Sequence, residues 1–395
     1  MNLSKATLDK GFAAAFGGKP ERYFSAPGRT ELSGNHTDHQ RGRVLAGAVN
    51  LDMQAAVKVN GTATIRVLSK GYPMSQVCLD CLTPVEEEIN TTPALIRGVA
   101  ARFAQLGCNV AGFDVYMEST VLPGSGLSSS AAFEVLMGTI INALFFDGKV
   151  SQPEIAMIGQ AAENVFFGKP CGLMDQMASA VGGMVTIDFE DPKNPVICPV
   201  DFDFAACSHA LCIIDTRASH AELTDEYAAI TRELKGISGY FGKDVLRQIP
   251  EEAFYQEIPA LRQQFGDRAV LRAVHFYEEN ARVERQVAAL ERNDFATYLS
   301  LMKESGYSSY MYLQNVVPTG ATKNQEVALT LALCQKLLGG RGGYRVHGGG
   351  FAGTVQAFVP FDMLDAFRSG IDAVLGEGAC HVLSIRREGG VEVQV

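Results

Sequence analysis

A glycine- and serine-rich loop between two regular segments restricts most strongly what this chain can fold into. Residues 113–117 alternate apolar and polar side chains like a β-strand, and residues 133–144 place apolar side chains at helical spacing. Between them lies Leu-Pro-Gly-Ser-Gly-Leu-Ser-Ser-Ser-Ala-Ala, residues 122–132. Glycines let the backbone approach a ligand closely, and the free N–H groups at a helix start favour an anion. The segment therefore predicts a strand, a phosphate-binding loop and a helix in succession.

The residues of this loop also allow a simpler interpretation. Gly124 and Gly126 permit a tight turn, and the hydroxyls of residues 128–130 add donors, one of which could ligate magnesium. The lysine of the G-x-x-x-x-G-K-[ST] motif is missing, and that motif occurs nowhere in the chain. A serine cap after a glycine turn explains the loop alone equally well.

The rest of the chain predicts mixed α and β structure without an internal repeat. Asn60-Gly61 stands between two alternating runs, 51–59 and 62–69, which predicts a β-hairpin. The polar segment 189–195 contains two prolines and is the best break point, so we place domains at 1–200 and 201–395. Further elements are expected as follows: a helix from Thr92 to Gly107, strands over 183–188, 211–215 and 354–359, and helices over 221–235 and much of 283–336.

Composition excludes several classes of protein. The 395 residues carry 34 Lys+Arg against 44 Asp+Glu, a formal net charge of −10, which argues against a nucleic-acid surface. The longest apolar runs fall short of the roughly 20 residues that span a bilayer, and the first residues do not resemble a secretory signal. The 9 cysteines show no regular spacing. We expect a cytoplasmic protein with free thiols that is a monomer or a weak homo-oligomer and binds no membrane.

A second glycine cluster lies near the C-terminus. Gly348, Gly350 and Gly353 match G-x-G-x-x-G, but a strand follows them where a dinucleotide-binding motif needs a helix. The Rossmann interpretation is therefore rejected. A glycine-rich turn remains, packed closely against another loop or a ligand.

Two further segments concentrate polar residues. Residues 26–39 crowd short polar and charged side chains into one loop, which suits recognition of sugar hydroxyls; a zinc site at His36, Asp38 and His39 is less favoured, because no partner motif accompanies it. A solvated loop is the simpler alternative. In residues 163–176, Asp175 lies among apolar neighbours, which indicates either a helix cap or a base with a shifted pKa.

In this order, four segments resemble the GHMP small-molecule kinases, and in particular their galactose-phosphorylating members. The segments are Pro27-Gly-Arg29 with Gly34-Asn-His-Thr-Asp38, Gly124-Ser-Gly-Leu-Ser-Ser-Ser-Ala131, Glu163 with Pro170-Cys-Gly-Leu-Met-Asp-Gln176, and Gly348-Gly-Gly-Phe351. The resemblance spans essentially the whole chain. It implies an α+β fold of two domains, the first like ribosomal protein S5 and the second ferredoxin-like, with the active site in the cleft between them.

The resemblance also implies an activity and a role for each residue. The activity is transfer of the γ-phosphoryl group of ATP to the anomeric (C1) hydroxyl of galactose. Asp175 would take the hydroxyl proton, Arg29 would stabilise Asp175 and the transferring group, and Ser130 with Glu163 would bind Mg²⁺. The ATP-binding residues would be Gly124, Ser125, Gly126, Leu127, Ser128, Ser129, Ser130, Gly348, Gly349 and Gly350, and the sugar-binding residues Asn35, His36, Thr37, Asp38, Gly172 and Tyr227.

Departures from the family pattern concern the sugar. The family has Asn, Glu and Tyr at the positions of Glu31, Asn35 and His39, and in this chain Arg41 and Arg43 follow. Losing a glutamate at position 35 beside basic residues would remove a negative charge, so the pocket could accept a C6 carboxylate. A kinase for galacturonate or another galactose-configured sugar is therefore the first alternative. A non-catalytic sugar sensor is the second, and the retained Arg29, Glu163 and Asp175 argue against it.

Overall fold

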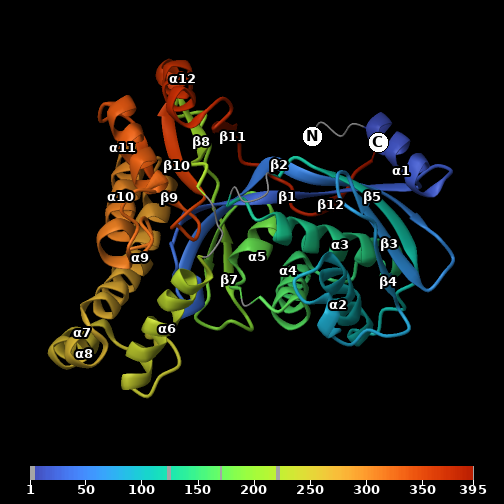
Figure 1. Ribbon diagram of the computed structural model, residues 1–395, viewed down its shortest axis with the longest axis horizontal. Helices are drawn as coiled ribbons and strands as arrows, with labels where there is room; N and C mark the ends of the chain where they lie inside the picture. Colours follow the sequence, from blue (N-terminus) through green and yellow to red (C-terminus); the bar gives the residue numbers. More distant parts are fainter. Residues whose placement is uncertain (1–4, 122–125, 170, 219–222, 395) are drawn as a thin grey trace.

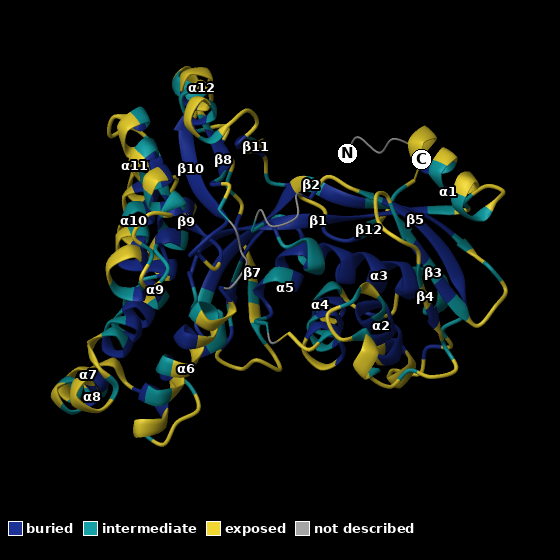
Figure 2. Cartoon of the chain, viewed as in Figure 1, coloured by how far each residue is buried: buried dark blue, intermediate teal, exposed yellow. Residues whose placement is uncertain are grey.

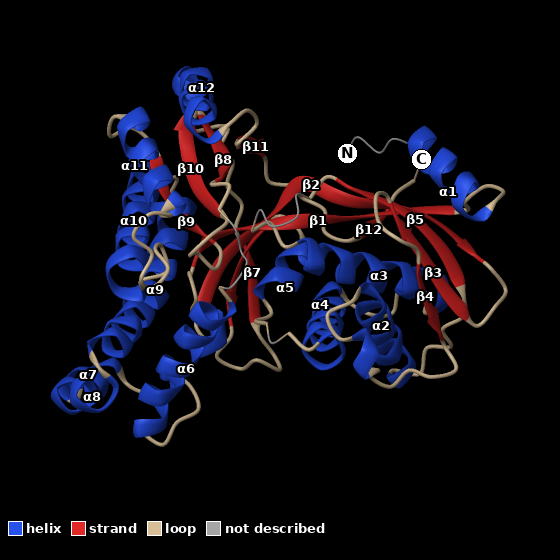
Figure 3. Ribbon diagram, in the orientation of Figure 1, coloured by secondary structure: helices blue, strands red, loops and turns tan. Residues whose placement is uncertain are grey.

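Two β-sheets with helices packed around each make up the part of the chain that the computed structural model describes, residues 5–121, 126–169, 171–218 and 223–394 (Figures 1 and 3). The larger sheet lies with its helices at the right of Figure 1, and the smaller sheet stands at the left. Among the described residues, no helix combines the length and apolar character that a membrane span requires.

Eight strands of the described chain form the larger sheet, in the order β12-β1-β2-β5-β3-β4, with β6 beside β2 and β7 beside β6. The long strand β2 pairs with β6 through its first residues and with β5 through its last, while β1 follows its other edge. β3 and β5 run parallel, whereas the other described pairs are antiparallel. The strands are β1 (Arg22–Ser33), β2 (Arg43–Val59), β3 (Thr64–Ser69), β4 (Ser75–Cys78), β5 (Phe113–Ser119), β6 (Met184–Asp188), β7 (Val196–Pro199) and β12 (Val391–Glu392).

The predicted hairpin at Asn60-Gly61 is wrong. β5 lies between β2 and β3, so the two strands that flank this turn do not pair with each other. The turn is bonded to β5 and the residue before it: the Asn60 N–H donates to Gly112 O at 3.1 Å, and Asn60 Nδ2 donates to Asp114 Oδ1 at 2.8 Å. An Asn-Gly signal describes only the local turn, and a later segment that can pair with both strands decides the sheet order.

Helices cover the lower face of the larger sheet in Figure 1, and its strands β1, β2 and β5 are buried along most of their length (Figure 2). Ile96, Phe103, Leu136 and Ile140 of these helices are fully buried against it. Burying such side chains contributes about 1.5–3 kcal/mol each, which explains why the apolar spacing predicted α2 and α3 correctly. The helices of this layer are α2 (Thr92–Gln105), α3 (Ser129–Phe145), α4 (Gln152–Ala161) and α5 (Met174–Val181), with the π-helical turn η3 (Ala162–Phe167) after α4; α1 (Lys5–Phe16) packs against β2 and β5.

The smaller sheet has the order β11-β8-β10-β9 and is antiparallel in its described pairs. Its strands are β8 (His209–Asp215), β9 (Gly343–His347), β10 (Thr354–Pro360) and β11 (Cys380–Leu383). α10, α11 and α12 pack against it, and α6 and α8 pack against the long helix α9. These helices are α6 (Thr224–Tyr240), α7 (Glu251–Gln256), α8 (Ile258–Phe265), α9 (Asp267–Glu291), α10 (Phe295–Ser308), α11 (Glu326–Leu338) and α12 (Leu364–Leu375). Single turns complete the chain: η1 (Asp38–Gln40), η2 (Glu86–Glu88), η4 (Leu246–Gln248), η5 (Ser309–Leu313) and η6 (Phe361–Met363).

The end of the chain returns to the larger sheet. β12 pairs with β1, with Ser25 opposite Val391, although it follows every element of the smaller sheet. β7 ends at Pro199 and β8 begins at His209. The division into residues 1–200 and 201–395 stays a prediction.

β1 is irregular at two places, one directly before Arg29 and one directly after Glu31. Its register against β2 shifts between Pro27 and Arg29 and again between Glu31 and Ser33. Such bulges bend a strand and redirect its side chains. At the first bulge, a Cβ on Gly28 would lie 2.9 Å from Leu127 O, so only glycine lets β1 and the loop before α3 approach this closely.

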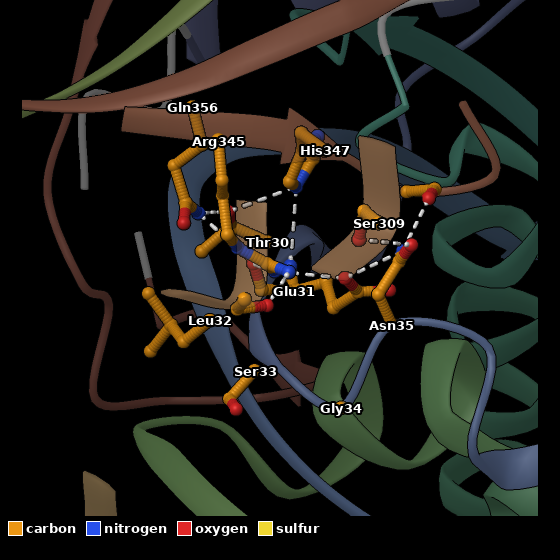
Figure 4. Close-up of polar contacts among 12 residues, drawn as sticks. Thr30, Glu31, Leu32, Ser33, Gly34, Asn35, Ser309, Arg345, His347 and Gln356 are labelled. Carbon is orange, nitrogen blue, oxygen red and sulfur yellow. Dashed lines mark hydrogen bonds and ion pairs between the residues drawn. The ribbon is translucent and has the colours of Figure 1, made fainter. Parts of the chain in front are cut away.

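A buried ion pair joins β1 to the smaller sheet (Figure 4). Arg345 Nη2 on β9 donates to Glu31 Oε1 at 2.7 Å and to the Glu31 carbonyl at 2.8 Å, and the two side chains are 0% and 4% exposed. The Glu31 N–H donates to His347 Nε2 at 3.1 Å, and Gln356 Nε2 donates to the Glu31 carbonyl at 3.0 Å. Because His347 Nε2 accepts that N–H, its proton lies on Nδ1, which donates to Thr354 Oγ1 at 2.9 Å. Both sheets are thus fixed to each other through one strand.

We predict that Arg345→Met lowers the free energy of unfolding by about 3–5 kcal/mol, because the Glu31 carboxylate is left buried without its cation. The double variant Glu31→Gln/Arg345→Met should recover part of that loss. Denaturant unfolding measures both, with Arg341→Met as control, since its partner Asp362 is exposed and that pair should contribute less than about 1 kcal/mol. Equal, small losses for Arg345→Met and Arg341→Met would contradict this account.

Candidate active site

Arg29 and Asp175 form an ion pair beside the loop that precedes α3. Arg29 follows the first bulge of β1, and its Nε donates to Asp175 Oδ1 on α5 at 2.7 Å. The Arg29 side chain is 7% exposed, whereas that of Asp175 is 31% exposed. The Arg29 guanidinium also donates to the carbonyl of Gly126, and the backbone N–H of Arg29 donates to Leu127 O at 3.0 Å. One arginine therefore holds both the carboxylate and the loop.

The surroundings of Asp175 keep its carboxylate charged. Burial raises the pKa of this carboxyl, but the charge and hydrogen bond of Arg29, with a hydrogen bond from Ser128, outweigh burial and hold the pKa below its ordinary value. A partly exposed carboxylate fixed by a guanidinium can accept a proton from a bound hydroxyl without moving.

The loop after β1 brings a second carboxylate close to the first. Asp38 Oδ1 accepts the His39 N–H at 2.8 Å, and a Cβ on Gly172 would lie 1.7 Å from Asp38 Oδ2. Burial, with the nearby Asp175 charge, raises the pKa of Asp38 to about 6. The Thr37 hydroxyl lies within hydrogen-bond distance of the carbonyls of Gly34 and Arg43, so this predicted sugar ligand stabilises the loop.

Asn35 is fully buried, and protein groups occupy both ends of its amide. Its Nδ2 donates to Glu31 Oε1 at 3.0 Å and to Gly348 O at 2.6 Å. Its Oδ1 accepts from Asn315 Nδ2 at 2.9 Å and from Ser309 Oγ at 3.3 Å. In this structure Asn35 therefore connects the loop after β1 to the glycine cluster, as Figure 4 shows for its contacts with Glu31 and Ser309.

The carbonyls of the cluster Gly348–Gly350 all accept hydrogen bonds from side chains. Asn35 binds the first, His36 Nε2 donates to Gly349 O at 3.0 Å, and the Tyr227 hydroxyl donates to Gly350 O at 2.9 Å. A Cβ on Gly349 would lie 2.7 Å from the Tyr227 ring, which explains the glycine there. The loop before α3 meets the residues flanking this cluster: a Cβ on Gly126 would lie 2.9 Å from Thr354 Oγ1 and 3.1 Å from His347 Nδ1.

The first turn of α3 carries a hydroxyl that faces a carboxylate from η3. Ser130 Oγ donates to Glu163 Oε1 at 3.4 Å, and Lys169 Nζ donates to the same oxygen at 3.1 Å. Although burial lowers it, the pKa of Lys169 is raised overall by the Glu163 carboxylate. Lys169 was not among the residues predicted from sequence, and its place beside Glu163 depends on the turn that ends η3.

Two fully buried polar side chains lie behind Glu163. Gln176 Nε2 donates at 2.9 Å both to Glu163 Oε2 and to Glu134 Oε2. Burial, with the Glu163 charge, raises the pKa of Glu134 well above its ordinary value. Neither Gln176 nor Glu134 was predicted from sequence, although Gln176 directly follows Asp175.

A cavity of about 510 Å³ opens at the start of α3. Ser129 and Ser130 line it together with side chains from β3, β5 and α2, such as Val67, Met117 and Leu95. A cavity lined by apolar side chains together with a few polar groups is typical of a small-molecule site. Gly124 and Ser125, the two other predicted loop residues, lie outside the described residues.

The zinc alternative has no support within the described residues, where no group of three or more His, Cys, Asp or Glu side chains could hold a metal ion. His36 Nδ1 instead lies 3.3 Å from His39 Nε2.

Comparison with known proteins identifies the family. The model of the GHMP kinase N-terminal domain matches residues 94–183, and the galactokinase galactose-binding signature matches residues 10–59. A galactokinase of Glaesserella parasuis is 32% identical over 359 residues, which cover 90% of each chain. A galactokinase of Streptomyces coelicolor is 31% identical over 368 residues, covering 93% of this chain and 92% of its own. This chain belongs to the galactokinases of the GHMP kinase family.

Solved structures share the fold of this galactokinase. Lactococcus lactis galactokinase complexed with galactose has a TM-score of 0.83 at 24% identity and covers 98% of this chain and 99% of its own. A mevalonate kinase has a TM-score of 0.64 at 14% identity and covers 93% and 100%. The expected α+β fold, the family and the galactokinase activity are therefore confirmed, and membership of the GHMP kinases implies the use of ATP.

The charge expected around position 35 of this galactokinase is wrong. Glu31 and Asn35 depart from the family pattern, and their side chains are hydrogen-bonded to each other. The carboxylate and the amide have exchanged positions, so the negative charge is retained at Glu31 and paired with Arg345. Burial lowers the pKa of His39 to about 3, which leaves the ring neutral, and Arg43 pairs with Asp188 and Glu284. The argument for a pocket that prefers a C6 carboxylate then rests on Arg41 alone.

We predict that Asp38→Asn stabilises the free galactokinase above pH 6 by on the order of 1 kcal/mol. A carboxyl whose folded pKa lies above its unfolded value contributes stability at low pH and loses it as the pH rises from about 4 through 6. Denaturant unfolding at pH 5 and pH 8 measures the effect: the variant should gain clearly more on the wild type at pH 8 than at pH 5. The same difference at both pH values would contradict the raised pKa.

Proposed function

We propose that this galactokinase transfers the γ-phosphoryl group of ATP to the anomeric hydroxyl of galactose, with Asp175 as the proton acceptor, giving galactose 1-phosphate and ADP. The observation that carries the proposal is the 2.7 Å ion pair of Arg29 and Asp175, held against the loop before α3 by two further bonds from Arg29. Phosphoryl transfer depends mainly on positioning and on stabilisation of charge, and a preorganised guanidinium–carboxylate pair supplies both.

The start of α3 suits the phosphates of ATP. The first turn of this 17-residue helix has backbone N–H groups without helical partners, which form the positive end of the helix dipole. The hydroxyls of Ser128, Ser129 and Ser130 lie at the same end. The adjoining cavity of about 510 Å³ has room for the nucleoside. Gly124, Ser125, Gly126 and Leu127 complete the proposed phosphate loop. His347 and Thr354, which flank Gly348–Gly350, lie against it at Gly126, so the cluster is proposed to lie close to the nucleotide.

Ser130 and Glu163 suit Mg²⁺. A hydroxyl and a carboxylate oxygen 3.4 Å apart are hard ligands, and the Lys169 ammonium at 3.1 Å from the same Glu163 oxygen shows that this position attracts a cation. Mg²⁺ in kinases is held by one or two protein oxygens together with phosphates. When bound, the ion would neutralise phosphate charge.

The proposed reaction exchanges one bond at phosphorus and transfers one proton. The C1 oxygen of the sugar bonds to the γ-phosphorus, and the bond from that phosphorus to the oxygen bridging the β-phosphate breaks as ADP leaves. The C1 hydroxyl proton passes to Asp175, whose lowered pKa keeps it ionised at neutral pH. Arg29 stabilises the charge on the transferring group without reorganising.

Galactose as the sugar is supported by the matched galactose-binding signature and by the galactose bound to the Lactococcus lactis relative. Asp38 and His36 are the proposed contacts to its hydroxyls, with Gly172 leaving room beside Asp38 and Tyr227 holding the glycine cluster. Asn35 and Thr37 act through the shape of their loop.

We predict that Asp175→Asn lowers kcat by about 10²–10⁴-fold while the dissociation constant for galactose changes only a few-fold, because the amide keeps the shape of the carboxylate but accepts no proton. Coupled assay of ADP release and calorimetric titration of galactose measure the two quantities. A non-catalytic sensor would show no turnover in the wild type either.

The sugar is tested with a panel. We predict that galactose is turned over with a higher kcat/KM than galacturonate, arabinose or N-acetylgalactosamine, because the galactose-binding signature matches residues 10–59, the His39 ring is neutral and Arg43 is paired. Turnover of galacturonate without turnover of galactose would overturn the proposed substrate and leave the kinase assignment intact.

A further inference from the structure

Gln176 takes part neither in the ion pair of Arg29 and Asp175 nor in the contacts of the loop between β1 and β2. It lies on the first turn of α5 directly after Asp175, and its side chain is fully buried, with contacts to α3, α4 and η3. Its amide nitrogen donates to Glu163 Oε2 and to Glu134 Oε2, each at 2.9 Å, and lies 3.6 Å from the Cys171 sulfur. A single amide thus bridges two carboxylates from different helical segments.

The bridge fixes the rotation of the Glu163 carboxylate. Because Oε2 accepts from Gln176, the other oxygen, Oε1, faces Ser130 at 3.4 Å and the Lys169 ammonium at 3.1 Å. A carboxylate whose two oxygens differ in this way presents one defined oxygen to a cation. Groups that orient a metal ligand from behind typically change metal affinity by 10–100-fold when removed.

Glu134 is the anchor of this arrangement. It is fully buried on α3, and the described residues supply its carboxylate with no cation; Gln176 is the donor that reaches it. Gly159 of α4 confines it from the other side, since a Cβ there would lie 3.1 Å from Glu134 Oε2 and 3.2 Å from Gln176 Cγ. A buried carboxylate of this kind costs free energy that a leucine would not, so it is not explained by stability.

We propose that Gln176 is a positioning residue for the cation that accompanies the nucleotide: it orients Glu163 through one hydrogen bond and is itself anchored on Glu134 through the other. This inference rests on the proposed role of Glu163 as a magnesium ligand. Because Gln176 adjoins Asp175, the first turn of α5 then positions both the proton acceptor and the metal ligand.

The test measures cation binding apart from turnover. Mn²⁺ is titrated into the protein in the presence of ADP, and free Mn²⁺ is followed by its EPR signal; galactose binding without nucleotide is measured by calorimetry. Gln176→Leu should weaken Mn²⁺ binding about 10-fold or more and change the galactose dissociation constant less than twofold. Gln152→Leu is the matched control, since it removes a half-buried amide from the same helical layer, bonded to Gly390 O, and should change neither quantity.

Two outcomes overturn the inference. The first is Mn²⁺ affinity in Gln176→Leu within twofold of the wild type. The second applies if that variant does not fold: Glu134→Gln keeps an oxygen that can accept from Gln176 and should retain most of the affinity, whereas Glu134→Leu should lose it, and equal effects would contradict the anchor. Glu163→Gln distinguishes failure of the proposed metal ligand from failure of the proposed positioning residue. Unchanged Mn²⁺ affinity in that variant would refute Glu163 as a metal ligand, whatever Gln176→Leu does.

Discussion

The buried ion pair of Glu31 and Arg345 fixes the strand on which the functional residues of this galactokinase depend. β1 carries Arg29 two residues before Glu31, and the loop with His36 and Asp38 begins soon after it. Arg345, His347 and Gln356 of the smaller sheet bind the backbone and side chain of Glu31. Buried ion pairs stabilise a fold poorly in comparison with apolar contacts, but a shifted register would leave both charges buried without a partner. Here the register of β1 against the smaller sheet determines the position at which the loop between β1 and β2 contacts Gly348–Gly350.

The two bulges let this one strand serve several partners. An even β-strand alternates its side chains between two faces, whereas the shifts at Gly28 and Leu32 redirect them. Arg29 consequently reaches α5 and the loop before α3, while Glu31 reaches β9. Gly28 is required for the first bulge because the loop backbone passes at the place a side chain would occupy. The glycine excess of the chain is therefore informative at a few positions where backbones meet.

The sequence predicted the regular elements better than their partners. Apolar spacing predicted α2 and α3, and alternation predicted β5, because burial against one sheet imposes those periods. The hairpin at Asn60-Gly61 was wrong because strand order is decided by segments distant in sequence. The same limit applies to the site. The apolar neighbours of Asp175 left a helix cap and a base both open, and its predicted role came from the family resemblance. Gln176 beside it gave no signal, since its amide matters only when the fold brings Glu134 and Glu163 to it. Likewise, the exchange of Glu31 and Asn35 could be seen as two departures, but not as one contact.

Acidic side chains outnumber basic ones around the first turn of α5. The carboxylates of Asp38, Glu134, Glu163 and Asp175 gather there, and Arg29 and Lys169 are the cations that the described contacts supply to them. Arg29 is paired with Asp175, so Asp38 and Glu134 have no ion-pair partner among the described contacts. Burial and neighbouring negative charge raise the pKa of Asp38 to about 6 and that of Glu134 well above its ordinary value. Lys169 is 62% exposed and can leave Glu163, which makes it a replaceable cation. The Mg²⁺ proposed to bind Glu163 would gain binding energy by relieving repulsion that is already present between these carboxyl groups.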